Sequence, residues 1–312
     1  MSITFQVDHG RAEVIRRQRR RLAVLWLVAA LLPAGGCSTE EPPAHLPPLS
    51  SVPGSPRIPG KFDWADLVTD DVPAAQKFYS RLFGWTYRHV GDYVIACNDD
   101  RPLGGMFQRP RPKDQSAQPR WFGYISVSNV ERAEKTVRQS GGRVLQEPRQ
   151  MPDRGVQAVF ADSEGAVFGV VKSSSGDLPD FLADPGDWIW IQLLSRDGRK
   201  AAEFYRAVGG YEIVENVETN RQSDYVLTSE GYARATVRTI RSADTKVRPT
   251  WLPFVRVKSV AETVALAGQI GGRVLVAPSP NLMDGNVAVI ADPTGAAIGV
   301  LEWHEGLLKG GR

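Results

Sequence analysis

Cysteine is scarce in this chain, which has two, Cys37 and Cys97, among 312 residues. If Cys37 is covalently modified, as its context below predicts, Cys97 is the only thiol left and no intramolecular disulfide can form. Cys97 lies in the alternating run "DYVIACND", where a buried, unreactive thiol is expected. The fold therefore has to depend on apolar cores, for which the 42 % apolar content is sufficient.

Histidine and excess charge are equally limited. No two of the four histidines have metal-ligand spacing, and the sequence contains neither a glycine-rich phosphate loop nor a nucleophile elbow. The formal net charge is +3, but residues 1–36 carry six arginines against Asp8 and Glu13, a net +4. The remainder therefore carries −1, and nucleic acid is not an expected partner.

The first residues have the order of a targeting segment. A basic run, "RRQRRR", precedes the apolar span 22–34, which is too short to cross a bilayer, and small residues then lead to Cys37. The string "LPAGGC" resembles the lipobox of bacterial lipoproteins, in which the cysteine is acylated. We predict a signal peptide over 1–36, lipidation of Cys37 and an exported protein anchored to a membrane of the cell envelope. An ordinary cleaved signal peptide or an anchor helix is the alternative.

A proline-rich segment follows the proposed lipidation site. Residues 38–60 hold seven prolines and almost nothing that could form a core. We expect residues 37–60 to be the lipidated cysteine and a semi-rigid spacer between membrane and globular domain.

An internal repeat organises the rest of the chain. A shift of 130 positions places residues 119–171 on 249–301 without a gap, with "GGRVL" on "GGRVL" and "ADSEGAVFGV" on "ADPTGAAIGV". Each copy predicts a strand, a helix capped by Asn129 or Ser259, a Gly-Gly helix end and three further strands. The repeated unit is therefore βαβββ.

A variant of this unit occurs at 62–108 and again at 188–240, with Asp71 and Asp197 as helix caps. The chain thus contains four modules. The predicted organisation is a first domain of two modules over 61–173, a linker over 174–186, a second domain of two modules over 187–304 and a tail over 305–312. The pattern leaves open which modules pair.

The strings "DVPAAQKFYSRLFGW" (71–85) and "ADPTGAAIGVLEW" (291–303) resemble the vicinal oxygen chelate superfamily, the glyoxalase/bleomycin-resistance/extradiol dioxygenase group, in its tandem two-domain form. The resemblance covers about 61–303. It implies an α+β fold of four βαβββ modules paired into two domains with curved mixed sheets, each enclosing a cleft for a metal or ligand. Because four modules can pair within one chain, a monomer is expected.

The resemblance also places metal ligands on the first and last strands of paired modules. Those positions fall on residues without carboxylate or imidazole groups: Trp64, Phe122, Gly169, Trp190, Leu252 and Gly299. The A-type last strands, within 103–107 and 233–237, add none. We therefore predict no metal and no other cofactor.

Aromatic and amide side chains occupy the expected clefts instead. Period-two alternation places Trp64 with Asp66, Phe122 with Tyr124, and Trp190 with Gln192, and these six are the predicted ligand-binding residues. A register shift of one residue would instead present Asp63, Ala65, Ile189 and Ile191. Asp66 is the candidate acid/base residue, since a desolvated carboxyl has a raised pKa.

Three functions are consistent with this sequence. One is a membrane-tethered lipoprotein that binds a small, partly aromatic molecule without a metal. Another is a glyoxalase-like lyase or isomerase, or a dioxygenase-type enzyme, with a non-standard site around Asp66 or a bound organic cofactor. The third is an envelope interaction or scaffold protein in which both clefts are filled by core side chains.

Overall fold

The computed structural model describes residues 46–52, 54–111, 118–217, 223–241, 244 and 246–303. The predicted signal peptide, the lipidation site at Cys37, the first part of the spacer, and the tail lie outside these residues. Within the described part of the chain, every helix is too short or too polar to span a bilayer.

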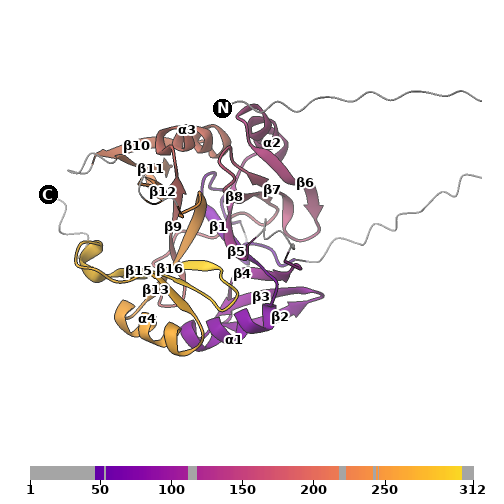
Figure 1. The fold of residues 1–312 in the computed structure, drawn as a ribbon. Coiled ribbons are helices and arrows are strands. Elements are labelled where there is room, and N and C mark those ends of the chain that lie inside the picture. The colour runs from indigo at the N-terminus through magenta and orange to yellow at the C-terminus, as the bar shows by residue number, and fades with distance from the viewer. Residues whose placement is uncertain are drawn as a thin grey trace, which may run out of the picture. The chain divides into compact units, whose positions relative to one another are not determined.

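The first half forms one eight-stranded mixed sheet in the order β2-β3-β4-β1-β5-β8-β7-β6 (Figure 1). Its elements are β1 (Phe62–Thr69), α1 (Val72–Phe83), β2 (Thr86–Val90), β3 (Tyr93–Asn98), β4 (Arg101–Gln108), β5 (Arg120–Ser126), α2 (Val130–Gln139), β6 (Arg143–Met151), β7 (Gly155–Ala161) and β8 (Val167–Ser173).

The second half repeats this sheet in the order β10-β11-β12-β9-β13-β16-β15-β14. Its elements are β9 (Trp188–Ser195), α3 (Gly198–Gly209), β10 (Glu212–Val217), β11 (Ser223–Ser229), β12 (Tyr232–Thr239), β13 (Thr250–Val257), α4 (Val260–Gln269), β14 (Arg273–Val276), β15 (Val287–Ala291) and β16 (Ala297–Glu302), with a short 3₁₀ turn at Met283–Gly285. The predicted four βαβββ modules in an α+β fold are confirmed.

The pairing that the sequence left open is settled by the central strands. β1 pairs with β5, and β9 pairs with β13, both antiparallel. The last strand of each module runs parallel to its first, as in β1 with β4 and β13 with β16. Each sheet is therefore built from the two modules of one half.

The four helices begin where the sequence predicts. Asp71, Asn129, Asp197 and Ser259 are the N-caps, and each side chain accepts a hydrogen bond from the backbone three residues later. Gly84 ends α1 in the left-handed conformation (φ 79°), which glycine adopts without a steric penalty. Local capping chemistry therefore sets these boundaries.

Helices from opposite halves pack together. α1 and α4 lie side by side, as do α2 and α3 (Figure 1). One apolar cluster contains Phe78 and Leu67 from the first half with Val260 and Ile298 from the second. A second cluster likewise joins α2 and its strands to α3 and its strands. Backbone pairing thus follows the halves, whereas core packing crosses between them.

Two symmetric hydrogen-bonded chains also join the halves. The Tyr79 hydroxyl, on α1, donates to Asp292 Oδ2 (3.1 Å) in the β15–β16 turn and accepts from Trp121 Nε1 (2.8 Å). The Tyr205 hydroxyl, on α3, donates to Asp162 Oδ2 (3.0 Å) in the β7–β8 turn and accepts from Trp251 Nε1 (2.8 Å). The repeated Phe-Tyr, Ala-Asp and Trp motifs thus belong to one interface arrangement.

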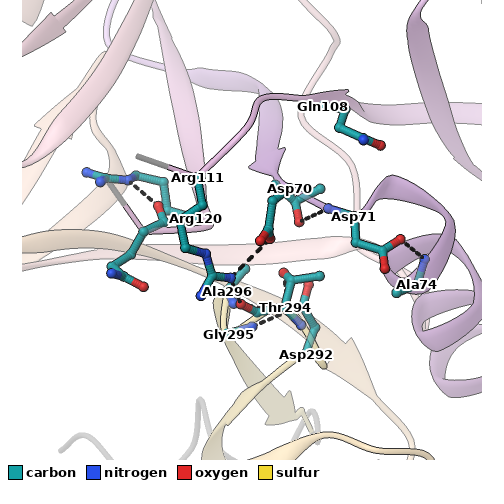
Figure 2. Close-up of polar contacts among 12 residues, drawn as sticks. Asp70, Asp71, Ala74, Gln108, Arg111, Arg120, Asp292, Thr294, Gly295 and Ala296 are labelled. Atoms are coloured by element: carbon teal, nitrogen blue, oxygen red, sulfur yellow. Dashed lines mark hydrogen bonds and ion pairs between the residues drawn. The ribbon is translucent and has the colours of Figure 1, made fainter. Parts of the chain in front are cut away.

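Asp292 serves its own turn as well as the opposite half. Its Oδ1 accepts from the backbone amides of Thr294 (2.8 Å), Gly295 (2.9 Å) and Ala296 (3.0 Å) beneath the turn (Figure 2). Nearby, Arg111 donates both to Asp70 Oδ1 and to the Thr294 carbonyl oxygen, each at 3.0 Å (Figure 2). The turn between β15 and β16 is therefore fixed to the first half by two separate polar contacts.

The Tyr79–Asp292 contact generates a test. Tyr79→Phe is expected to lower the free energy of unfolding by about 1–3 kcal/mol, because Asp292 and Trp121 each lose a buried hydrogen-bond partner. Urea unfolding measures this. Tyr87→Phe is the matched control, since the Tyr87 hydroxyl donates within one module, to the Gln76 carbonyl (3.0 Å). Equal losses in both variants would contradict a special role for the contact between halves.

Candidate ligand-binding site

Each sheet has two helices on one face, and the predicted ligand-binding residues lie on the opposite face. We call this opposite face the first helix-free face in the first half and the second helix-free face in the second half. Trp64, Phe122 and Tyr124 form an apolar cluster on the first face. Ala65 and Leu67, the alternate residues of β1, pack with α1 on the other side. The predicted alternation is therefore correct on β1, and the one-residue shift is excluded there.

Asp66 lies at the centre of the first face and is only 4 % exposed. Its Oδ1 accepts from Trp64 Nε1 (2.9 Å) and the Tyr93 hydroxyl (2.5 Å), and its Oδ2 accepts from the Tyr124 hydroxyl (2.9 Å). Burial raises the pKa of the Asp66 carboxyl, while the Tyr93 hydrogen bond and the charge of Arg154 oppose that rise. Three of the predicted residues therefore meet in one buried network, and the acid/base role of Asp66 stays a prediction.

Tyr93, which the sequence analysis did not single out, completes this network. It begins β3 and shares the first face with Ile95 and Cys97, at period-two spacing. The alternation of "YVIACN" was therefore a signal that could have found it. Cys97 is buried, as expected.

Aromatic rings on the helix-free faces lie over glycines of the neighbouring strands. A Cβ atom at Gly169 would overlap the ring of Tyr124, and one at Gly299 would overlap the ring of Phe254. Gly169 and Gly299 are the positions at which the resemblance places a metal-binding glutamate. The rings therefore occupy the space that a carboxylate side chain would need.

The donor set at the predicted metal positions does not fit a divalent cation. Trp64, Phe122 and Leu252 offer no coordinating atom of their side chains, and the indole nitrogen of Trp64 is a donor only. Within the described ranges, His, Cys, Asp and Glu side chains do not gather in any group of three or more. On the first face Asp66 is instead accompanied by an organic cation, Arg154.

Arg154 and the segment before β1 cover the first face. The Arg154 guanidinium carbon lies 3.9 Å from the centre of a Trp64 ring, and its Nε donates to the Pro47 carbonyl oxygen (3.0 Å). Leu49 packs into the cluster with Trp64 and Tyr124. Arg154 lies in the β6–β7 turn, where no local pattern indicates such a contact.

This packing differs from the expected spacer. Leu46, Leu49 and Ile58 are buried, and the Ile58 amide donates to Asp177 Oδ2 (2.5 Å). The reason is that the few apolar side chains between the prolines find an apolar surface to cover. The described part of 46–60 is therefore associated with the first half.

The second face has a more accessible polar centre. Trp190 Nε1 and Gln192 Nε2 both donate to Thr236 Oγ1, each at 3.1 Å. Trp190 and Gln192 are both half-buried. Leu252 and Phe254 form the apolar floor with Trp190. Gln192 stands where Asp66 stands in the first half, so a neutral amide replaces the carboxylate. Thr236 was not foreseen from the sequence.

Comparison with known proteins gives a consistent relationship. Residues 61–170 match the model of the Glyoxalase/Bleomycin resistance protein/Dioxygenase superfamily. The anthracycline biosynthesis protein DauV of Streptomyces sp. (strain C5) is 30 % identical over 265 residues, covering 79 % of this chain and 94 % of DauV. The glyoxylase-like protein CFP32 of Mycobacterium tuberculosis is 28 % identical over 260 residues, covering 78 % of this chain and 95 % of CFP32.

Solved structures share the fold at low identity. The Mn(II)-bound glyoxalase of Novosphingobium aromaticivorans superimposes with a TM-score of 0.55 at 15 % identity, over 78 % of this chain and 82 % of that one. A variant of homoprotocatechuate 2,3-dioxygenase from Brevibacterium fuscum gives 0.57 at 13 % identity, over 82 % and 74 %. With DauV matched across nearly its full length, these findings establish that the chain belongs to the glyoxalase/bleomycin resistance protein/dioxygenase superfamily.

Proposed function

We propose that this protein binds a small, partly aromatic, uncharged molecule on the second helix-free face without a metal. The observation that carries the proposal is the replacement of metal-binding side chains by aromatic rings folded over Gly169 and Gly299. A site walled by rings, with few polar groups, favours flat apolar ligands over hydrated ions.

The two faces differ in their access to a ligand. On the first face, Leu49 covers the aromatic cluster, and Asp66 already accepts three hydrogen bonds. On the second face, Trp190 and Gln192 remain half-buried. Leu282 and Trp303 pack against the apolar cluster of the second face, but an incoming molecule still meets a partly accessible indole and amide there.

The second face can hold a flat ligand by two complementary interactions. The Trp190 indole offers a ring face for stacking, and its orientation is set by the bond to Thr236. The Gln192 amide shares that partner and also carries a carbonyl oxygen that can accept from a ligand hydroxyl. Since neither group titrates near neutral pH, the face is suited to binding rather than to proton transfer.

The relatives support the ligand class. Two anthracycline biosynthesis proteins of Streptomyces, DauV and DnrV, match about four fifths of this chain. Anthracyclines are fused-ring aromatic compounds with hydroxyl and carbonyl groups, and this chemistry is compatible with an indole beside an amide. We propose the same broad class here, presented at a membrane through the lipid on Cys37.

Binding of 2-naphthol, a neutral flat probe with one hydroxyl group, tests the second face. Trp190→Ala is expected to weaken binding at least about tenfold through lost stacking, and Gln192→Ala about three- to tenfold through a lost hydrogen bond. Isothermal titration calorimetry of the full chain measures both. Leu145→Ala, at an exposed position on β6, is the control. Unchanged affinity in Gln192→Ala would contradict the proposed location.

Metal binding tests the other part of the proposal. After incubation with manganese, iron, nickel or zinc and desalting, the protein is expected to retain far less than one ion per chain, as measured by elemental analysis. The reason is the lack of coordinating side chains at the predicted positions. Stoichiometric metal that is lost in Asp66→Asn would overturn the metal-free site and favour an enzyme centred on the first face.

The proposed anchor has its own test. Cys37→Ser is expected to abolish incorporation of an alkyne-labelled fatty acid and to move the protein from the membrane to the aqueous fraction, because the thiol is the acylation site. Cys97→Ser is the matched control, since Cys97 is buried within the first half. Labelling that persists without Cys37 would exclude it as the lipid attachment point.

A further inference from the structure

A cavity of about 320 Å³ lies between the two halves, and its lining includes Trp64 and Trp190 of the two helix-free faces but neither Gln192 nor Thr236. It is lined by the first residues of β1, β4, β9 and β12 and by linker residues 178–181. This volume is at the lower end of the range for small-molecule sites, enough for one fused pair of rings. Both halves and the linker contribute, so the cavity exists only in the tandem arrangement.

Aromatic side chains form much of its wall. Trp188 is held by a hydrogen bond from Nε1 to the Leu103 carbonyl oxygen (2.9 Å) and by edge-on contacts with Trp85 and Trp121, at 5.4 and 5.2 Å between ring centres. Phe181, in the linker, is 47 % exposed despite its size. The rigid indole of Trp188 and the ring of Phe181, over which the Arg101 guanidinium carbon lies 4.8 Å from the ring centre, provide surfaces for a flat ligand.

Two arginines in the lining have unused donors. Arg234 pairs with Asp180 (2.8 Å), and Arg101 pairs with Asp187. In each arginine the Nε atom is buried and has no hydrogen-bond partner within the described part of the chain. A buried, unpaired donor is costly, so an acceptor supplied by a ligand would be stabilising at both positions. The side chain of Arg234 is only 6 % exposed, which makes its unpaired Nε the stronger indication.

The charge of the cavity points to an anion. Lys61, Arg101 and Arg234 supply three positive charges, against Asp180 and Asp187. The remaining acid, Asp63, has a fully buried side chain at a β-bulge, with Lys61 Nζ at 3.6 Å and no hydrogen bond to either oxygen in the described structure. Burial raises the pKa of Asp63 well above its ordinary value, and the charge of Asp177 raises it further. Burial therefore disfavours the charged form of Asp63 and weakens its opposition to the three basic side chains.

We propose that the cavity between the halves binds a planar aromatic carboxylate, with the ring between Trp188 and Phe181 and the carboxylate facing the Nε donors of Arg101 and Arg234. This site goes beyond the second face, because it selects an anion where that face selects a neutral molecule. Guanidinium groups suit carboxylates better than ammonium groups do, since their N–H donors are fixed in one plane.

The test uses 2-naphthoate as the probe and titration calorimetry of the full chain. Arg234→Lys and Arg101→Lys keep the charge but remove Nε, and each is expected to weaken binding about tenfold; Phe181→Ala is expected to weaken it by a smaller factor. Arg111→Lys is the matched control, because Arg111 also joins the halves, through Asp70 and Thr294, but lies outside the cavity lining. Methyl 2-naphthoate, which lacks the charge, is expected to bind more weakly and with no dependence on Arg234.

The outcomes separate this site from the second face. Weaker binding of 2-naphthoate in Arg234→Lys, with Arg111→Lys at the wild-type level and all variants melting at similar temperatures, supports the cavity. Wild-type affinity in both arginine variants overturns it, as does the absence of 2-naphthoate binding at millimolar concentration. If Gln192→Ala rather than Arg234→Lys weakens binding, the carboxylate is held on the second face and the cavity proposal fails, while the proposed function stands.

Discussion

The contact between a helix tyrosine of one half and a turn aspartate of the other determines how this chain is assembled. Asp162 and Asp292 each use one carboxylate oxygen to organise their own turn and the second to accept from Tyr205 or Tyr79. Because both tyrosines also accept from a buried tryptophan, a turn, a helix and a central strand are fixed together. The position of α1 against α4, and of α2 against α3, follows from these two contacts and the apolar clusters around them.

Local sequence patterns were sufficient for the modules. Helix caps such as Asp71 and Ser259 act over three residues, and the alternation of Trp64 with Asp66 needs only a strand. These features were therefore predictable. Which modules share a sheet was not predictable, because the four units are similar and the sequence favours no single pairing. Three further features could not be predicted from the sequence, because each depends on segments that are distant in sequence. They are the contact of Arg154 with Trp64, the packing of Leu49 on the first face, and the cavity beside Arg234.

The two halves have kept the same architecture while their helix-free faces have become chemically different. The first contains a carboxylate surrounded by two phenols, an indole and a guanidinium, all buried except the half-buried Tyr93. The second replaces the carboxylate by the amide of Gln192 and leaves it half-buried. In a buried charged network, a substitution that removes one member leaves its partners without hydrogen bonds. Substitutions on the first face are therefore expected to be destabilising. A neutral pair can change its partners at small cost, so the second face is the more adaptable one.

Because Leu46 and Leu49 are buried, the packed part of the chain begins at about residue 46, which would shorten a tether from Cys37. A lipid on Cys37 would be connected to a domain that begins at about residue 46 rather than at 61. Nine residues span at most about 30 Å when fully extended, whereas twenty-four span about 80 Å. If Cys37 carries the lipid, this shorter connection would hold the globular part close to the membrane, and ligands dissolved in or released at the bilayer surface would be the nearest to it.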